Sequence, residues 1–266
     1  MLPLVVRTLR RLAVGAPPVL FITTMAVAPL GSQQPPPPAA QPTPAQVAER
    51  QRAEDERLRN DWANLHRYRQ ANDSLPPPAA GEHRVVFMGN SITDAWARFF
   101  PQMFPGKSYI GRGISGQTTP QMLVRFRQDV IALKPAVVVI LAGTNDIAGN
   151  TGPSTLEMIE DNLMSMTELA RANGIRVVLS SVLPVYDYPW RPGLQPAAKI
   201  VALNAWMKAY AARVGAVYLD YHTAMADGRQ GLNAEWTRDG VHPNEAGYRV
   251  MAPLAEHAIA EALRRP

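Results

Sequence analysis

The sequence predicts a three-layer α/β/α sandwich built on a five-stranded parallel sheet and preceded by an N-terminal helix. From Glu82 onward, short β-branched runs alternate with longer helical patterns, which is typical of strands joined by covering helices. The run Ala136–Ala142 is apolar throughout, as a strand covered on both faces must be. With 266 residues, 47% of them hydrophobic, the chain is long enough for one sizeable core plus extensions.

Residues 1–31 have the pattern of an export signal. Three arginines within the first eleven residues precede a stretch without charge, residues 12–31, that contains a small-x-small cleavage pattern. This stretch is nearly long enough to span a bilayer, so a signal anchor is the alternative, but Pro17 and Pro18 interrupt it. We therefore expect a periplasmic or secreted protein with no stable membrane insertion after signal removal.

Two further segments precede the main domain. Residues 32–44 are rich in proline and are expected to form an extended tether. Residues 45–75 are charged and favour helix, with Trp62, Leu65 and Tyr68 at i, i+3, i+6 spacing. We interpret this segment as one long N-terminal helix that packs its aromatic edge against the main domain; the alternative is a partner-binding helix.

The remainder, residues 82–266, is expected to form a single domain. Its predicted strands are Arg84–Met88, Ser108–Ile110, Ala136–Ala142, Ile175–Ser181 and Ala216–Asp220. Its predicted helices cover about 91–100, 117–133, 154–173, 197–213 and Glu245–Arg264. In a parallel sheet with helices on both faces, functional groups gather at the carboxyl ends of the strands.

Composition excludes several classes of function. The formal charge of +5 falls to 5 − 3 = +2 without the three signal arginines, and the rest of the chain has no Lys/Arg-rich run, so no nucleic-acid partner is expected. The chain has no cysteine, which excludes disulfides and thiolate chemistry. Its five histidines show no i, i+4 ligand pair, so neither a metal nor another cofactor is expected.

Five residues from distant parts of the sequence are predicted to meet at one sheet edge. Ser91 follows the first strand, Gly116 the second and Asn145 the third, while Asp239 and His242 lie just before the final helix. Each motif alone is consistent with a helix cap, a turn or a loop hydrogen bond. Their occurrence together on one edge instead favours a Ser-His-Asp acyl hydrolase.

Each of these residues has an expected role. Ser91, on a strand-to-helix turn, would be the nucleophile, and His242 would take its proton and return it to the leaving alcohol. Asp239 would fix the imidazole tautomer. The backbone N–H groups of Ser91 and Gly116 and the side-chain amide of Asn145 would form the oxyanion hole.

The same segments resemble the motif blocks of the SGNH hydrolases, also called GDSL-type esterases and lipases. Blocks I, II, III and V of that family correspond here to Ser91, Gly116, Asn145, and Asp239 with His242. The similarity spans roughly residues 82–263. The resemblance implies a flavodoxin-like sheet and carboxylic ester hydrolysis.

One position departs from the usual family pattern. Asn90 stands where the family has Asp in Gly-Asp-Ser; asparagine keeps the size and an acceptor oxygen, so we expect the turn to survive. The version Gly-Asn-Ser-Ile-Thr-Asp-x-Trp, which starts at Gly89, resembles a bacterial subgroup of carbohydrate esterases and acetylhydrolases.

The substrate prediction depends on an aromatic loop after the fourth strand. Tyr186, Tyr188 and Trp190 are candidate substrate-binding residues for a sugar ring, with packing inside the protein as the alternative; Trp96 and Trp236 are expected in the core. We expect a serine esterase that removes acetyl or another short acyl group from a carbohydrate or small-molecule ester. The alternatives are a lysophospholipase or arylesterase of the same fold, and an inactive glycan-binding module.

Overall fold

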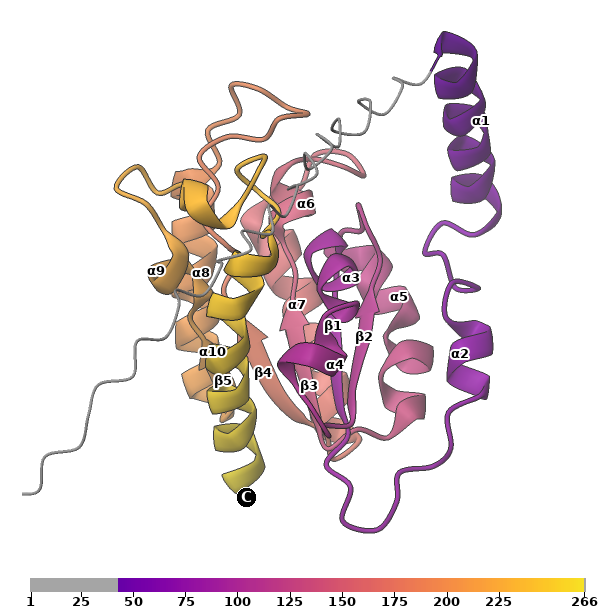
Figure 1. Cartoon of the computed structure of the whole chain (residues 1–266), viewed down its shortest axis with the longest axis vertical. Helices are drawn as coiled ribbons and strands as arrows, with labels where there is room; N and C mark the ends of the chain where they lie inside the picture. The colour runs from indigo at the N-terminus through magenta and orange to yellow at the C-terminus, as the bar shows by residue number, and fades with distance from the viewer. Residues whose placement is uncertain (1–42, 266) are drawn as a thin grey trace, which may run out of the picture. The chain divides into compact units, whose positions relative to one another are not determined.

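A wholly parallel five-stranded sheet forms the centre of the computed structural model, which describes residues 43–265 (Figure 1). Its strands are β1 Val85–Gly89, β2 Tyr109–Gly113, β3 Val137–Leu141, β4 Arg176–Ser180 and β5 Val217–Leu219. They are ordered β2-β1-β3-β4-β5, so the chain reverses its direction of winding between β1 and β3. Such a switch point opens a crevice at the carboxyl ends of the strands.

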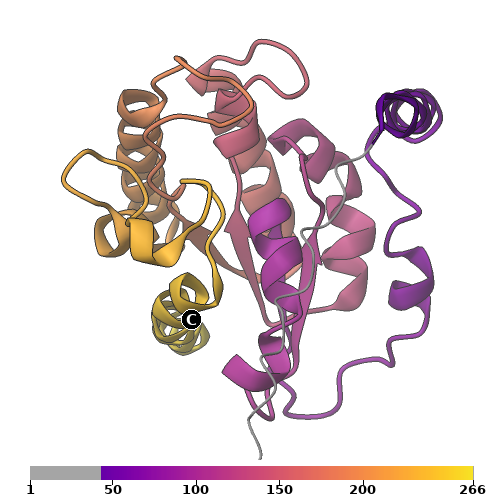
Figure 2. The same cartoon turned by 45° about the horizontal axis from the view of Figure 1, so that its top comes forward.

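Helices cover both faces of this sheet (Figures 1 and 2). In chain order after β1 they are α3 Ser91–Ala97, α4 Phe100–Met103, α5 Thr119–Asp129, α6 Thr144–Ile147, α7 Leu156–Ala172, α8 Ala197–Val214, α9 Tyr221–Met225 and α10 Glu245–Arg264, with 3₁₀ turns η1 Ile131–Leu133 and η2 Ala234–Trp236. The predicted α/β/α sandwich with a five-stranded parallel sheet is confirmed. The short α6 and α9 were not predicted.

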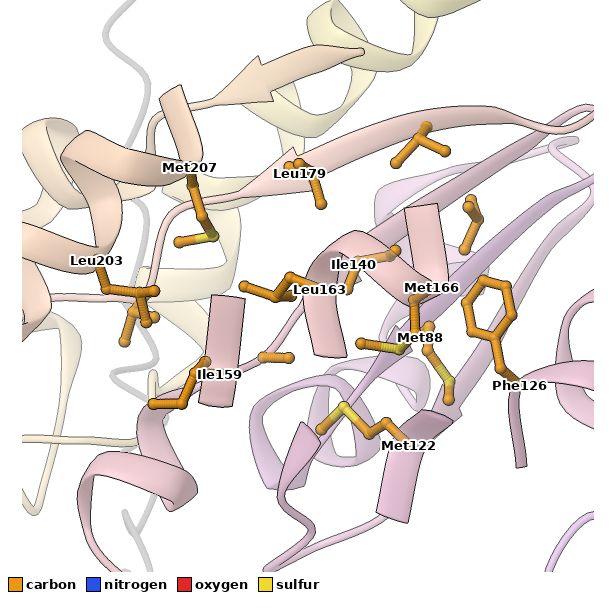
Figure 3. Packing of buried hydrophobic residues seen from close by; sticks show 14 of the residues in the cluster. Met88, Met122, Phe126, Ile140, Ile159, Leu163, Met166, Leu179, Leu203 and Met207 are labelled. Atoms are coloured by element: carbon orange, nitrogen blue, oxygen red, sulfur yellow. The ribbon is translucent and has the colours of Figure 1, made fainter. Parts of the chain in front are cut away.

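Two separate cores hold these layers together. On one face, α5, α7 and α8 pack a cluster rich in aliphatic and methionine side chains against the sheet (Figure 3). On the other, α3, α4, α9 and α10 enclose an aromatic cluster in which Trp96 stacks on Tyr248 at 5.5 Å between ring centroids. Trp96 is fully buried and Trp236 packs half-buried against the same cluster, as expected.

The N-terminal segment differs from the prediction of one helix over residues 45–75. It forms α1 Pro44–Asn60 and α2 Arg69–Asp73, joined by a run of turns. The Asp61 carboxylate accepts the backbone N–H groups of Leu65 (2.7 Å) and His66 (3.1 Å), and Asn64 has a positive φ of 55°. Because these side-chain bonds replace helical ones, the prediction of a continuous helix is wrong.

The predicted export signal, and all but the last two residues of the proline-rich tether, lie outside the described residues. Among the helices of residues 43–265, none has the length and apolar character needed to cross a membrane.

Candidate active site

The turn between β1 and α3 presents Ser91 at the carboxyl edge of the sheet. Asn90 is the N-cap of α3 and is buried, and its Oδ1 accepts the backbone N–H of Ile92 at 3.2 Å. The end of β2 lies against this turn: a Cβ on Gly113 would lie only 2.1 Å from the backbone nitrogen of Asp94. Glycine at position 113 therefore allows the second strand to pack directly on the first turn of α3.

Ser91, His242 and Asp239 lie within hydrogen-bonding distance in the expected order. The Oγ of Ser91 is 2.9 Å from Nε2 of His242, and Nδ1 of His242 is 2.7 Å from Oδ2 of Asp239. The chain therefore brings together three residues from opposite ends of the domain. This arrangement lets the imidazole accept the serine proton while the carboxylate holds its other nitrogen as a donor.

A compact loop fixes the carboxylate and the imidazole relative to each other. Oδ1 of Asp239 accepts the backbone N–H groups of His242 (2.8 Å) and Val241 (3.0 Å). Thr237 closes the loop, because its Oγ1 donates to the His242 carbonyl at 2.8 Å and accepts from the Gly240 N–H at 3.1 Å. Burial alone would raise the pKa of Asp239, but the hydrogen bonds from His242 and Val241 outweigh it and lower the pKa to about 2.

The two other candidate oxyanion donors lie in the segments that follow β2 and β3. Gly116 has a φ of +79°, which favours glycine, and nothing lies within 4 Å of the place its Cβ would take. Asn145 is 3% exposed, and its Nδ2 donates to the Gln117 carbonyl at 2.9 Å. Since an amide nitrogen carries two hydrogens, the second is left for a substrate oxygen. Asn150 donates to the Gly116 carbonyl at 3.2 Å.

Asp146 anchors the short helix that carries Asn145. Its buried carboxylate accepts the Oγ1 (2.6 Å) and the backbone N–H (2.9 Å) of Thr119, at the start of α5. Burial raises the pKa of Asp146 in spite of these hydrogen bonds. These hydrogen bonds link α6 to α5 and so fix the position of the helix that carries Asn145.

Two of the three predicted substrate-binding aromatics are exposed. Trp190 is 42% exposed, and its ring centroid lies 6.2 Å from that of His242. Its indole N–H donates to Oδ1 of Asn150 at 3.3 Å. Tyr186 is 54% exposed, with the guanidinium of Arg229 lying 5.0 Å from its ring centroid. Of the two, only Trp190 makes a ring contact with the imidazole.

Tyr188 has a different position from the one expected of a substrate contact. Its side chain is fully buried, with its hydroxyl 2.9 Å from both the Oγ1 and the carbonyl of Thr144. A ring without solvent exposure has no surface to offer a sugar. The prediction that Tyr188 contacts the substrate is therefore wrong: its hydroxyl instead links the aromatic loop to the start of α6.

The aromatic loop is also fixed from within. Asp187 accepts backbone N–H groups from Tyr188 (3.0 Å), Gly193 (2.6 Å) and Leu194 (3.2 Å). These hydrogen bonds lower the pKa of Asp187, with that from Gly193 contributing most. Asp187 therefore closes the aromatic loop by hydrogen bonds to the loop's own backbone. In this loop, the ring of Trp190 lies next to the imidazole of His242.

Some residues that support the site were not predicted to be functional. Thr237, Asn150, Gln117 and Arg125 all contact the candidate catalytic or oxyanion segments. Thr237 could have been predicted from the local sequence, because a hydroxyl two residues before a loop carboxylate often closes such a turn. The others depend on contacts between distant segments. In residues 43–265, no group of three or more His, Cys, Asp or Glu side chains has the arrangement of a metal site.

Comparison with known proteins gives consistent matches. Residues 87–250 match the model of the GDSL-like lipase/acylhydrolase family. Over 223 residues the chain is 26% identical to an acetylxylan esterase of Xylanibacter ruminicola; the match covers 70% of this chain and 45% of that protein, so the chain spans less than half of that relative. It is 28% identical over 171 residues to Esterase TesA of Pseudomonas aeruginosa, which covers 61% of this chain and 77% of the relative.

A solved structure resembles the chain over most of the domain. The crystal structure of a GDSL-like lipase from Bacteroides thetaiotaomicron is 48% identical and has a TM-score of 0.74. The match covers 76% of this chain and 100% of that chain.

Proposed function

Because this chain belongs to the GDSL-like lipase/acylhydrolase family and is a carboxylic ester hydrolase, we propose that it is a serine esterase using Ser91, His242 and Asp239. The observation that carries the proposal is the continuous set of contacts from Oγ of Ser91 through the imidazole to the carboxylate, at 2.9 Å and 2.7 Å. Such a chain of contacts activates a hydroxyl that is otherwise a weak nucleophile.

The proposed reaction has two halves. Nε2 of His242 takes the Ser91 proton as Oγ bonds to the ester carbonyl carbon, and the carbonyl oxygen becomes an oxyanion facing the N–H groups of Ser91, Gly116 and Asn145. As the oxyanion collapses, the bond to the alcohol breaks and His242 gives its proton to the leaving oxygen. Water, deprotonated by the same imidazole, then releases the acid and restores Ser91.

The proposed substrate is a carbohydrate that carries acetyl or another short acyl group. The exposed ring of Trp190 next to His242 supports it, because an aromatic face suits the flat, apolar side of a sugar. The similarity to an acetylxylan esterase agrees with this choice. With its predicted export signal, the enzyme would act on such esters outside the cytoplasm, in the periplasm or after secretion.

A panel of acetylated sugars and nitrophenyl esters of increasing chain length tests class and substrate together. Wild type should hydrolyse acetyl esters best, and Ser91→Ala should lose activity by about 10⁵-fold or more while it keeps the wild-type melting temperature. Preference for long acyl chains would instead indicate a lysophospholipase. Glycan binding without any hydrolysis, unchanged in Ser91→Ala, would indicate a binding module.

A further inference from the structure

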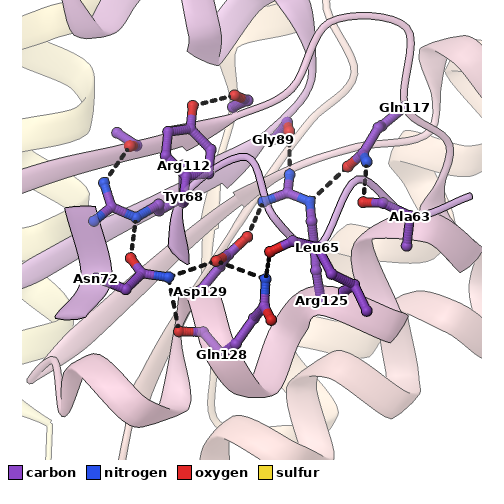
Figure 4. Close-up of polar contacts among 12 residues, drawn as sticks. Ala63, Leu65, Tyr68, Asn72, Gly89, Arg112, Gln117, Arg125, Gln128 and Asp129 are labelled. Atoms are coloured by element: carbon purple, nitrogen blue, oxygen red, sulfur yellow. Dashed lines mark hydrogen bonds and ion pairs between the residues drawn. The ribbon is translucent and has the colours of Figure 1, made fainter. Parts of the chain in front are cut away.

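The segment between α1 and β1 contacts the loop that carries Gly116 (Figure 4). We call residues 61–75 the brace and residues 113–117 the oxyanion loop. The hydroxyl of Tyr68 donates to the Gly113 carbonyl, and Nε2 of Gln117 donates to the Ala63 carbonyl at 2.7 Å. The brace precedes residues 87–250, the region that matches the family model, and so is not part of the matched region.

Gln117 joins the brace to two of the three candidate oxyanion donors, Gly116 and Asn145. It is 3% exposed and follows Gly116 directly. Its side-chain oxygen accepts from Nε of Arg125 at 2.5 Å, and its backbone carbonyl accepts from the Asn145 amide at 2.9 Å. The backbone of Gln117 is therefore connected directly to both donors, by the peptide bond to Gly116 and by the hydrogen bond from Asn145.

A buried ion pair fixes the other side of Gln117. Arg125 has no exposed surface, and its Nη1 lies 3.0 Å from Asp129. Its Nη2 donates at 2.9 Å to the carbonyl of Gly89, two residues before the proposed nucleophile. Asn72 of the brace donates to Asp129 at 2.7 Å. A fully paired buried network of this kind has few alternative arrangements and holds its members rigidly.

We propose that Gln117 is a positioning residue for the oxyanion hole and that the brace holds it in place. This inference rests on the proposed function. Oxyanion donors act only when they point at the charge that develops in the transition state, and small displacements of such groups cost much of the rate. Loss of the Gln117 side-chain contacts should therefore lower kcat and leave ground-state binding, and so KM, nearly unchanged.

A glutamine on the helix that follows the oxyanion loop provides a control. Gln128, on α5, donates through its Nε2 to a brace carbonyl, that of Leu65, at 2.6 Å. It makes the same kind of contact as Gln117 but has no contact with the oxyanion loop. Gln117→Met and Gln128→Met therefore each remove a hydrogen bond to a brace carbonyl. Only the first also removes side-chain hydrogen bonds that hold the oxyanion loop, those of Gln117 to Ala63 and from Arg125.

The test measures kcat, KM and melting temperature of both variants in the full chain with nitrophenyl acetate, well below the melting transition. Gln117→Met is expected to lose about tenfold or more in kcat with KM changed less than about twofold, whereas Gln128→Met should melt earlier and keep kcat within about twofold. A folded Gln117→Met enzyme with wild-type kcat, or equal kcat losses in both variants, would overturn the inference.

Two additional variants keep the result decisive. If Gln117→Met does not fold, Gln117→Glu, which keeps an acceptor for Arg125 and loses the donor to Ala63, is judged by the same kcat criterion. Ser91→Ala is measured in parallel. Full activity in Ser91→Ala would remove the proposed function and this inference together, whereas an inactive Ser91→Ala beside a fully active Gln117→Met would remove only the inference.

Discussion

The indole of Trp190 lies beside the imidazole of His242, with ring centroids 6.2 Å apart and planes inclined by 34°. The imidazole returns a proton to the leaving alcohol in the proposed reaction, so the indole borders the space into which that alcohol departs. This contact joins the candidate substrate surface to the candidate catalytic base.

Trp190→Ala should weaken the hydrolysis of acetylated sugars. Loss of one aromatic face is worth about 1 kcal/mol, so kcat/KM for an acetylated xylose should fall about fivefold. Methyl acetate, which has no ring to stack, should show a smaller loss. Trp190→Phe keeps an aromatic face and should recover most of the activity; equal losses on both substrates would contradict a role in sugar binding.

Asn145→Ala should reduce kcat about 10²- to 10³-fold, because one donor to the oxyanion is lost. The effect on KM should be small, since the donor acts mainly in the transition state. Steady-state kinetics with nitrophenyl acetate measures both constants. A large rise in KM with unchanged kcat would show that Asn145 binds the ground state instead.

The Asp239 carboxylate should make the stability of the fold sensitive to acid. Its pKa is lowered from 3.8 to about 2, so its ionised form stabilises the fold above about pH 4, and this contribution is lost as the pH falls through 2. Acid unfolding followed by circular dichroism measures this loss. Asp239→Asn, which has no carboxylate to protonate, should lose less stability between about pH 4 and about pH 2 than the wild type; an equal loss in both would contradict the prediction.

Replacing the same carboxylate tests its role in catalysis. Asp239→Asn should lower kcat about 10⁴-fold, because the amide can hold the imidazole in the wrong tautomer. The measurement is kcat at the pH optimum of the wild type. Retention of more than a tenth of the wild-type rate would remove Asp239 from the triad.

Tyr188→Phe should affect stability rather than substrate binding. The change removes the hydroxyl contacts with Thr144, whose carbonyl still accepts the Ala148 N–H at 3.0 Å, so the free energy of unfolding should fall by about 1 kcal/mol. Urea unfolding measures the loss, and KM for acetylated sugars should stay at the wild-type value. A raised KM with unchanged stability would restore Tyr188 as a substrate contact.

The sheet and the turn that holds Asp239 against His242 were predictable because they follow from local patterns. Strand β3 is apolar on both sides, and a parallel sheet places the residues after β1, β2 and β3 at one edge. The Asp-x-x-His spacing is itself local: Asp239 accepts the His242 N–H in a turn that needs no distant partner. The strand pattern and this turn are determined within a few residues, whereas the meeting of Ser91 and His242, 151 positions apart, follows from the topology of the sheet.

The brace and the aromatic loop were harder to predict because distant contacts decide them. Residues 61–68 have helical composition, yet Asp61 caps its own turn. The carbonyls of Ala63 and Leu65 accept from the side chains of Gln117, just before α5, and Gln128, on α5. These tertiary hydrogen bonds compete with those of a helix and outweigh a weak propensity. Likewise, nothing in the sequence distinguishes the buried ring of Tyr188 from the exposed ring of Trp190.

The carboxylate that closes the aromatic loop from within has a consequence for how this enzyme can diversify. Asp187 organises the loop by bonds to the loop's own backbone, so exposed side chains of the loop can be exchanged without loss of its internal bonds. Tyr188 and Trp190 are different, because they contact Thr144 and Asn150, which lie beside the candidate oxyanion donors. We therefore expect new ester preferences to be reached most readily by exchanging the exposed loop residues while Asp187, Tyr188 and Trp190 are kept.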